Sequence, residues 1–365
     1  MTKQNQEFHG SDLEAVERAY GIKKEDIISF SANVNPLGIS PKLRENLTDK
    51  IDAITSYPDR DYTSLRKEIA SYSNVNIENI IVGNGATELI SLFIKIIKPK
   101  NALVVGPTYS EYERELNLEG GQVSYHQLEE EKDFQLDLDR LKKDLESDID
   151  LLIICNPNNP TSSAITNKDM EEILKAGKKN NIFLMVDETY VEFVEDINKI
   201  SSAPLSRQYD NIIVLRGISK FFAAPGLRLG YGICGNKDLI NEINRQKNPW
   251  SINSLAAVAG EIMFTDEEYI KETRRLISTE RERIYSILAS NRNVKCYKPS
   301  ANFMLVKILK EGISSRNLFQ AAIKEGYMIR DCSTFPFLGD KFIRFCFMSP
   351  EDNDKLIELL VNELE

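Results

Sequence analysis

The sequence is poor in histidine and has no clustered cysteines. Only two of its 365 residues are histidines, His9 and His126. A Ser–His–Asp triad or a histidine-ligated metal site is therefore not expected. The cysteines are odd in number and widely spaced, which fits neither a disulfide framework nor a zinc site, and we interpret them as buried thiols of a protein in the reducing cytoplasm. They are Cys155, Cys234, Cys296, Cys332 and Cys346.

Charge of one sign does not accumulate along the chain, and long apolar runs are missing. The net charge is −10 at pH 7, with acidic and basic residues interspersed. A nucleic-acid-binding protein would need a basic stripe, which the sequence lacks. No apolar run approaches the roughly 20 residues that span a bilayer, and the first ten residues, MTKQNQEFHG, lack the apolar core of a secretion signal. We expect a cytoplasmic protein in which local arginines and backbone amides hold any anionic ligand.

What the sequence does contain is an alternation of apolar runs and helical patterns between about residues 80 and 235. This alternation predicts an α/β fold with a mostly parallel sheet, whose strands are joined by crossover helices and covered on both faces. The expected strands are Ile80–Val82, Ala102–Val105, Leu151–Cys155, Ile182–Val186, Ile212–Leu215 and Tyr231–Cys234, and the expected helices include Ala86–Ile97, Tyr109–Leu118 and Asp169–Lys179.

The pattern changes after Pro249. A long helical stretch, roughly Ser254–Ser290, is dense in alternating charges. Because a chain of this length is too long for one simple core, we expect a second, smaller α+β lobe formed by the C-terminal third with the N-terminal arm. Its further strand and helix patterns are Phe303–Val306, Leu318–Lys324, Phe342–Phe347 and Asp352–Leu364.

The segment Val214–Gly232, VLRGISKFFAAPGLRLGYG, presents a lysine just past the end of an expected strand. Lys220 follows a hydroxyl, Ser219, and precedes Arg228 by eight residues. An amine becomes nucleophilic when desolvation or a neighbouring cation lowers its pKa. Arg228 can supply that cation and also grip a phosphate with its planar fork. For a lone lysine a solvated surface position would be the better interpretation, but the other strand ends favour a reactive amine.

Asp187 ends the apolar run Ile182–Val186, and Tyr190 follows three residues later. Such a carboxylate is either a helix N-cap or a buried anion that keeps a ring nitrogen protonated. Ligands of open α/β sheets bind at the carboxyl ends of the strands. Asp187 and Lys220 end different strands of one expected sheet, so they can face the same ligand.

Other turns have both a structural and a ligand-binding interpretation. Residues 83–88, GNGATE, open a helix and form either a backbone cradle for an anion or an ordinary turn. Asn159 stands in the stiff turn NPNNPT, where its amide is aimed by the flanking prolines. Tyr109 either stacks on a flat ring or packs in the core. Tyr57 begins a Tyr-Pro-Asp sequence that is equally compatible with a simple turn.

Two arginines lie in or beside apolar runs. Arg344 is inside Phe342–Phe347, and Arg330 directly follows Met328–Ile329. An arginine in so apolar a strand usually pairs with an anion. That anion is either a ligand or an internal carboxylate.

Together the segments NPNNPT, VDETY and SKFFAAPGLRLGYG resemble those of the fold type I pyridoxal-phosphate enzymes of the class I and II aminotransferase superfamily. The resemblance covers nearly the whole chain and is closest to histidinol-phosphate aminotransferases and L-threonine-O-3-phosphate decarboxylases. The decarboxylase match rests on His9-Gly10, Phe30–Gly38 (FSANVNPLG), KFFAAPGLRLGY and Ile329–Gly339. It implies a three-layer αβα large domain at 45–248, and a smaller α+β domain made of 1–44 and 249–365.

The resemblance also implies pyridoxal 5′-phosphate as cofactor and assigns roles to residues. Lys220 would bond covalently to the cofactor aldehyde, and Asp187 would pair with the ring nitrogen. Tyr190 and Asn159 would hydrogen-bond the ring phenolate oxygen, while Tyr109 would stack on the ring. The cofactor phosphate would contact Gly85, Ala86, Ser219, Arg228 and, from the neighbouring subunit of a homodimer with shared active sites, Tyr57.

For the substrate, the resemblance implies that Arg344 binds a carboxylate. His9, Asn33 and Arg330 would form a pocket for a substrate phosphate. One departure from the family pattern is Gly217, where these enzymes more often carry a hydroxyl residue that helps to hold the cofactor phosphate.

We expect decarboxylation of L-threonine O-3-phosphate to (R)-1-amino-2-propanol phosphate, a step of cobalamin side-chain synthesis. The alternative is a histidinol-phosphate aminotransferase of histidine biosynthesis that uses 2-oxoglutarate. The cofactor motifs do not choose between these reactions, because the substrate-binding residues decide which bond breaks. A non-catalytic protein that merely retains the fold is disfavoured by the intact Lys220, Asp187 and Asn159.

Overall fold

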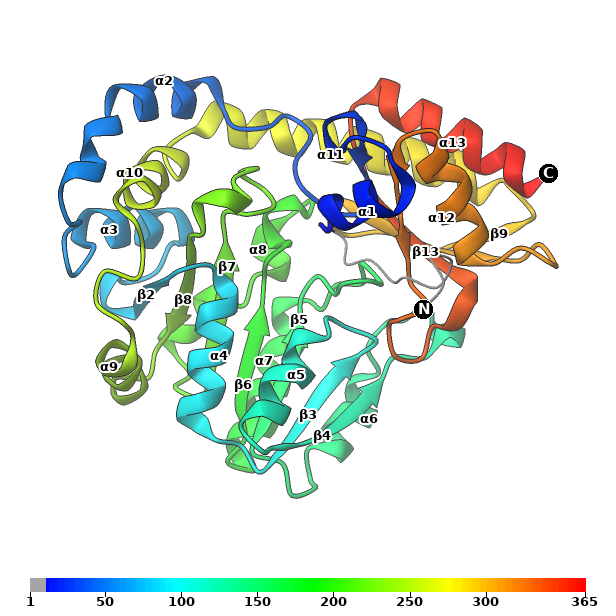
Figure 1. Ribbon diagram of the computed structural model, residues 1–365. Helices are drawn as coiled ribbons and strands as arrows, with labels where there is room; N and C mark the ends of the chain where they lie inside the picture. The colour runs from blue at the N-terminus through cyan, green and yellow to red at the C-terminus, as the bar shows by residue number, and fades with distance from the viewer. Residues whose placement is uncertain (1–10) are drawn as a thin grey trace.

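The computed structural model describes residues 11–365, and its centre is a seven-stranded sheet with the order β2-β8-β7-β6-β5-β3-β4 (Figure 1). Strands β7, β6, β5, β3 and β4 run parallel, whereas β8 pairs antiparallel with both β7 and β2. The mostly parallel sheet is therefore confirmed. Its strands are β2 (Ile80–Gly83), β3 (Asn101–Gly106), β4 (Gln122–Gln127), β5 (Leu151–Cys155), β6 (Phe183–Asp187), β7 (Ile212–Gly217) and β8 (Gly230–Cys234).

Strand β4 is absent from the sequence-based expectations. It lies at the edge of the sheet, and its residues are mostly exposed or partly buried. An edge strand of this kind has no continuous apolar run, so its polar sequence QVSYHQ gives little signal.

Helices cover both faces of this sheet, as a three-layer αβα fold requires. Alternate residues of the strands divide into two cores, because successive side chains of a strand point to opposite faces. One core joins the sheet to α4 (Ala86–Ile97), α5 (Glu111–Leu118) and α9 (Lys237–Gln246). The other joins it to α6 (Leu138–Asp144) and α7 (Asn167–Lys179). A short helix, α8 (Ile197–Ile200), follows β6.

A four-stranded antiparallel sheet with the order β12-β13-β10-β9 lies in the C-terminal third. Its strands are β9 (Val294–Cys296), β10 (Phe303–Ile308), β12 (Arg330–Asp331) and β13 (Phe342–Cys346). The N-terminal arm joins this region, because β1 (Ile28–Ser29) pairs in parallel with β11 (Tyr327–Met328).

The helices of this region gather beyond one end of the large sheet (Figure 1). In the same view α1 lies beside α12, and the rings of Tyr20 and Phe319 meet edge to face at 6.1 Å. The helices are α1 (Leu13–Tyr20), α2 (Pro41–Asp49), α10 (Ser254–Met263), α11 (Glu267–Ala289), α12 (Ser315–Lys324) and α13 (Pro350–Leu364). Helix α3 (Thr63–Ser73) precedes β2 in the chain and contacts both β2 and α10.

The long helical stretch expected over Ser254–Ser290 is present, and it is divided into two helices. Helix α10 ends at Met263, and α11 begins at Glu267. Asp266 caps α11, since its side chain accepts a hydrogen bond from the backbone N–H of Tyr269 at 3.3 Å. Phe264 sits at the break and packs edge to face against Tyr231 in the core. No proline or glycine stands at residues 264–266, so the strongest helix-breaking signals are absent from the break.

The cysteines are all free thiols; four are buried and Cys296 is partly buried. Among residues 11–365 no helix is both long and apolar enough to cross a membrane. The same part of the chain holds no group of three or more His, Cys, Asp or Glu side chains placed to bind a metal ion.

The carboxyl ends of β6 and β7 lie at the same edge of the large sheet, and two of the expected site residues stand there. Asp187 is the last residue of β6, and Lys220 follows β7 by three residues. Because β6 and β7 are parallel neighbours, with Asp187 opposite Leu215, both side chains stand at the same edge. The expectation that they follow different strands of one sheet is confirmed, and the structure shows that these strands are neighbours.

Candidate active site

A cavity of about 480 Å³ lies at the carboxyl ends of the central strands. The large sheet and α4 form one side of it, and residues 29–34 of the N-terminal arm together with β12 and β13 form the other. It gathers most of the residues that the sequence singles out. These are Asn33, Ala86, Tyr109, Asn159, Asp187, Tyr190, Ser219, Lys220, Arg228, Arg330 and Arg344.

Two of the expected site residues within 11–365, Gly85 and Tyr57, do not line this cavity. Gly85 approaches the guanidinium of Arg228, and Tyr57 is 81% exposed at the molecular surface, where its ring packs on Trp250 with centroids 4.8 Å apart. His9 lies outside the described residues.

Lys220 is the amine of the cavity. Its Nζ donates a hydrogen bond to the backbone oxygen of Ala32 at 2.6 Å. Burial is the main cause that lowers the pKa of Lys220 to about 8, and the positive charges of Arg344 and Arg228 act in the same direction. The sequence suggested Arg228 as the neighbouring cation, but in the structure Arg344 has the larger effect.

Asp187 is the carboxylate of the cavity and is only 5% exposed. Its Oδ2 accepts a hydrogen bond from the phenol of Tyr112 at 2.6 Å. Its Oδ1 accepts two from Thr189, at 2.9 Å from the backbone N–H and 2.6 Å from Oγ1. Asp187 forms no ion pair with any residue in the range 11–365. A buried carboxylate without a cation of its own fits a ligand group that carries a positive charge, such as a protonated ring nitrogen.

The N-terminus of α4 and Arg228 form the end of the cavity that suits a phosphate. Gly85 precedes the helix with φ at +82°, and a Cβ at this position would lie 2.5 Å from Nη2 of Arg228. A Cβ on Gly230 would lie 2.3 Å from the backbone nitrogen of Ala86. Glycine at both positions therefore lets Arg228 and β8 approach the first amides of the helix. Helix amides, an arginine and the hydroxyl of Ser219 together fit a phosphate group.

Arg344 is buried, with 4% of its surface exposed, and makes no ion pair within the described part of the chain. Its Nη1 donates to Oδ1 of Asn159, and its Nη2 donates to the backbone oxygen of Ser31 at 2.6 Å. The alternative of an internal salt bridge is therefore not realised there. Because a buried guanidinium without a carboxylate is costly, Arg344 fits an anionic ligand.

Asn159 and Tyr190 stand beside Arg344. Since Oδ1 of Asn159 accepts from Arg344, only its amide N–H groups remain to donate to a ligand. The hydroxyl of Tyr190 accepts a hydrogen bond from Nδ2 of Asn33 at 3.4 Å. Burial raises the pKa of Tyr190, so its phenol stays a donor at neutral pH.

Arg330 lies on β12, on the opposite side of the cavity from the large sheet. Its Nη2 donates to Oγ1 of Thr334 at 2.8 Å, and its guanidinium lies 5.3 Å from the centre of the Phe335 ring. Both contacts orient the planar group, and all three residues line the cavity.

Several buried polar atoms of cavity-lining residues make no hydrogen bond within residues 11–365. A ligand with several donors and acceptors would satisfy them. They are Oγ of Ser29, Oγ of Ser31, Oδ1 of Asn33, Oγ1 of Thr108 and Nε of Arg344. Together with Asp187 and the end of the cavity formed by the N-terminus of α4 and Arg228, these atoms fit pyridoxal phosphate and a polar substrate.

The structure adds site residues that the sequence analysis missed. Tyr112 comes one helical turn after Tyr109, and Thr189 lies inside the VDETY segment, so both were close to recognised motifs. Ser31 belongs to the FSANVNPLG segment. Spacing gave no sign that the side chains of Tyr112 and Thr189 donate to Asp187, or that the backbone oxygen of Ser31 accepts from Arg344.

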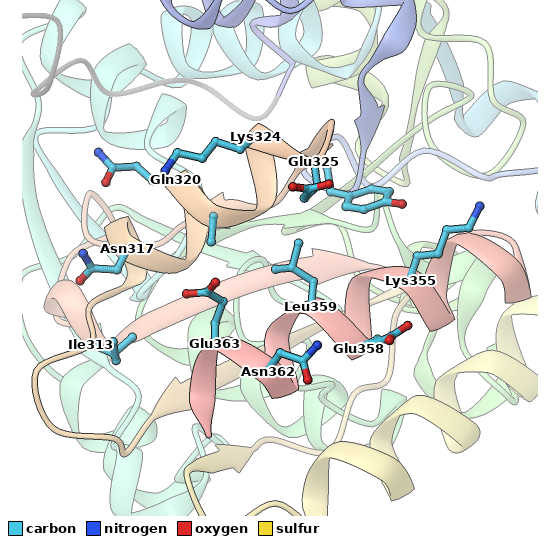
Figure 2. Close-up of a pocket in the computed structure, with 12 residues that line it drawn as sticks. Ile313, Asn317, Gln320, Lys324, Glu325, Lys355, Glu358, Leu359, Asn362 and Glu363 are labelled. Carbon is cyan, nitrogen blue, oxygen red and sulfur yellow. The ribbon is translucent and has the colours of Figure 1, made fainter.

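A second hollow, of about 670 Å³, lies between α12 and α13 and contains none of the expected site residues (Figure 2). Charges of both signs alternate along it, such as Lys324 and Glu325 on α12 and Lys355 and Glu358 on α13. The candidate active site is therefore the cavity around Lys220.

Comparison with known proteins shows the family of the chain. The family model described as aminotransferase class I and II matches residues 25–360. A protein of Caldanaerobacter subterraneus, provisionally named a threonine-phosphate decarboxylase, is 38% identical over 90% of this chain and 88% of its own. The histidinol-phosphate aminotransferase of Methanocaldococcus jannaschii is 32% identical over 96% of this chain and 93% of its own. The crystal structure of the histidinol-phosphate aminotransferase from Clostridium acetobutylicum superposes with a TM-score of 0.86 at 33% identity, covering 92% of this chain and 98% of that one.

Proposed function

The chain belongs to the class I and II aminotransferase family and is a pyridoxal-phosphate-dependent enzyme, and we propose that it decarboxylates L-threonine O-3-phosphate to (R)-1-amino-2-propanol phosphate. The observation that carries this proposal is the pair of arginines, Arg344 and Arg330, on one cavity. Phosphothreonine has a carboxylate and a phosphate, so it offers an anion to each. The relative with 38% identity, whose provisional name states this activity, supports the same choice.

The geometry of the cavity supports the cofactor-binding part of the proposal, whose residue roles come from the family resemblance. Lys220 would hold the cofactor aldehyde, while Asp187 would face the ring nitrogen and Tyr109 one face of the ring. The backbone of Gly85 and Ala86, together with Ser219 and Arg228, would hold the phosphate. Asn159 and Tyr190 would donate hydrogen bonds to the ring oxygen. When bound, pyridoxal phosphate supplies an electron-withdrawing ring that stabilises negative charge at the substrate α-carbon.

The substrate-binding residues would choose which bond of the α-carbon breaks. Arg344 would hold the carboxylate by its guanidinium fork, and Arg330 with Asn33 and His9 would hold the substrate phosphate. Two fixed anions leave the substrate little freedom to rotate, so the carboxylate can be kept perpendicular to the ring plane. Lys220 would then deliver a proton to the α-carbon after CO₂ has left.

We also propose a homodimer whose subunits share their active sites. Tyr57 does not line the cavity of its own subunit; it is largely exposed and packs on Trp250, and the exposed side chains of Ile51 and Ile54 come shortly before it in the chain. A second copy covering this apolar surface would bring Tyr57 to the phosphate of the partner's cofactor. The proposed division is a large cofactor-binding domain at 45–248, and a small domain formed by 1–44 and 249–365.

The second candidate is a histidinol-phosphate aminotransferase, which the Clostridium acetobutylicum structure favours by its TM-score of 0.86. In that reaction Arg330 would hold the phosphate of histidinol phosphate, and Arg344 would hold a carboxylate of 2-oxoglutarate. Both candidates can therefore engage both arginines, but only phosphothreonine offers the carboxylate and the phosphate in one molecule. The reaction products decide between the two candidates.

The test is to offer the holoenzyme each substrate in turn. Decarboxylation predicts CO₂ from phosphothreonine, and glutamate from histidinol phosphate with 2-oxoglutarate would indicate the aminotransferase. The enzyme class has a test of its own: Lys220→Ala should abolish the absorbance band near the visible edge that the bound cofactor gives. A wild-type protein that takes up no cofactor would contradict both candidates.

A further inference from the structure

We propose that Tyr112 is a positioning residue that holds the carboxylate of Asp187 and the ring of Tyr109 in the arrangement that receives the cofactor ring. The inference rests on the proposed placement of the ring nitrogen beside Asp187. It concerns a residue of α5 that neither donates to the substrate nor belongs to a recognised motif.

Tyr112 contacts both groups through different parts of its side chain. The hydroxyl donates to Oδ2 of Asp187 at 2.6 Å. The ring meets Tyr109 edge to face, with centroids 5.6 Å apart and an interplanar angle of 86°. Tyr109 and Asp187 come from different strand ends, after β3 and at the end of β6. Tyr112 is therefore a single rigid connection between them.

The buried surroundings of Tyr112 fix its ring and keep its hydroxyl a hydrogen-bond donor. It is fully buried, and its ring packs in the core between the sheet and α4. Burial, followed by the negative charge of Asp187, raises the pKa of the Tyr112 phenol well above its ordinary value. The phenol is therefore protonated across the working pH range and always acts as donor.

The bond to Tyr112 complements the two bonds from Thr189. Thr189 donates only to Oδ1, and Tyr112 donates to Oδ2, so each carboxylate oxygen has its own fixed donor. Without the Tyr112 hydroxyl, Oδ2 would lose a hydrogen bond in a buried site, and the carboxylate could rotate about its last torsion.

The experiment measures cofactor affinity of the apoprotein by titration with pyridoxal phosphate, in parallel with kcat. Tyr112→Phe keeps the ring and removes the hydroxyl, and we expect it to weaken affinity about tenfold, in line with the loss of one hydrogen bond to a charged group. Tyr209→Phe is the matched control, since it removes a phenol that donates to Glu171 at 2.9 Å far from the cavity. The control should change affinity less than about twofold.

A double-mutant comparison separates positioning from a general structural role. In the Asp187→Asn background, Tyr112→Phe should have much less effect than in the wild type, because the charged acceptor is gone. Tyr112→Leu should weaken cofactor affinity more than Tyr112→Phe does, since it also removes the ring contact with Tyr109. Thermal unfolding of each apoprotein shows whether the variants fold.

The outcomes distinguish this inference from the proposed function. If Asp187→Asn leaves cofactor affinity unchanged, the placement of the ring nitrogen is wrong. If Asp187→Asn weakens affinity but Tyr112→Phe matches the Tyr209→Phe control, only the role of Tyr112 is contradicted. An equal loss from Tyr112→Phe in the wild-type and Asp187→Asn backgrounds would show that the hydroxyl acts on the fold rather than through Asp187.

Discussion

The Nζ of Lys220 donates a hydrogen bond to the backbone oxygen of Ala32, 2.6 Å away, so the lysine that follows β7 is tied to the N-terminal arm. The arm is in turn anchored in the C-terminal region, where β1 pairs with β11. The amine is thus buried between the two parts of the molecule, and this burial is the main cause of its lowered pKa.

The lowered pKa predicts how the apoprotein captures its cofactor at different pH. Only the neutral amine attacks an aldehyde, and the pKa of Lys220 is about 8 rather than its ordinary 10.5. From pH 7 to pH 9 the neutral fraction should rise about tenfold, whereas a lysine of ordinary pKa would rise about a hundredfold. Stopped-flow absorbance at several pH values measures this rate, with a simple alkyl amine as control. A hundredfold rise for the protein would contradict the desolvated environment of Lys220.

Gly230→Ala should disturb the phosphate end of the cavity. The new Cβ would lie 2.3 Å from the backbone nitrogen of Ala86, and backbone cannot move aside as a side chain can. We expect a loss of about 1–3 kcal/mol in the free energy of unfolding, together with weaker cofactor binding. Gly232→Ala, in the same strand, is the control, because its Cβ would find ordinary contacts at 3.4 Å and beyond. Similar unfolding curves for the two variants would argue against the close approach of β8 to α4.

Gly217→Ser should strengthen cofactor binding. The nearest atom to a Cβ at this position is the backbone oxygen of Leu229 at 3.5 Å, so a serine fits without strain. Gly217 lines the cavity near Ser219 and Arg228, where a second hydroxyl can donate to the phosphate. One added hydrogen bond to a charged group should tighten binding by about 1.5 kcal/mol, or roughly tenfold. Gly217→Ala, which adds the Cβ without the hydroxyl, separates the hydrogen bond from backbone effects.

Arg330→Ala should weaken the binding of phosphorylated substrates far more than it weakens the binding of the cofactor. Loss of one charged hydrogen-bonding partner of a phosphate should raise KM by about 10- to 100-fold. Thr334→Val is a milder companion, since it removes only the hydroxyl that accepts from Arg330 at 2.8 Å. Steady-state kinetics together with cofactor titration gives both quantities. An equal loss of affinity for the substrate and for the cofactor would mean that Arg330 has a structural role.

Much of the fold, and most of the residues that line the cavity around Lys220, could be predicted from the sequence. The central strands β5, β6 and β7 are buried along their length, so they form continuous apolar runs whose ends are sharply marked by Asp187 and Gly217. Edge strand β4 and the break between α10 and α11 could not be predicted, because neither has a clear signal in the pattern of apolar residues. The first is polar, and the second depends on how Phe264 packs in three dimensions.

The contacts between the residues of the cavity were harder to predict than which residues line it. Sequence spacing placed Arg344 in an apolar strand but left open whether a carboxylate of the chain or a ligand pairs with it. Only the packing of the strands shows that its guanidinium reaches Asn159 and the backbone of Ser31. The same holds for Tyr112, whose bond to Asp187 joins residues 75 positions apart.

The central claim is that the two arginines direct loss of CO₂ from a phosphorylated amino acid. Its most direct test gives the holoenzyme L-threonine O-3-phosphate labelled with ¹³C in the carboxyl group and compares the ¹³CO₂ released with the substrate consumed. The account predicts one CO₂ for each phosphothreonine consumed, with aminopropanol phosphate as the other product and no requirement for 2-oxoglutarate. Glutamate formed from histidinol phosphate and 2-oxoglutarate, with no ¹³CO₂ from phosphothreonine, would contradict it.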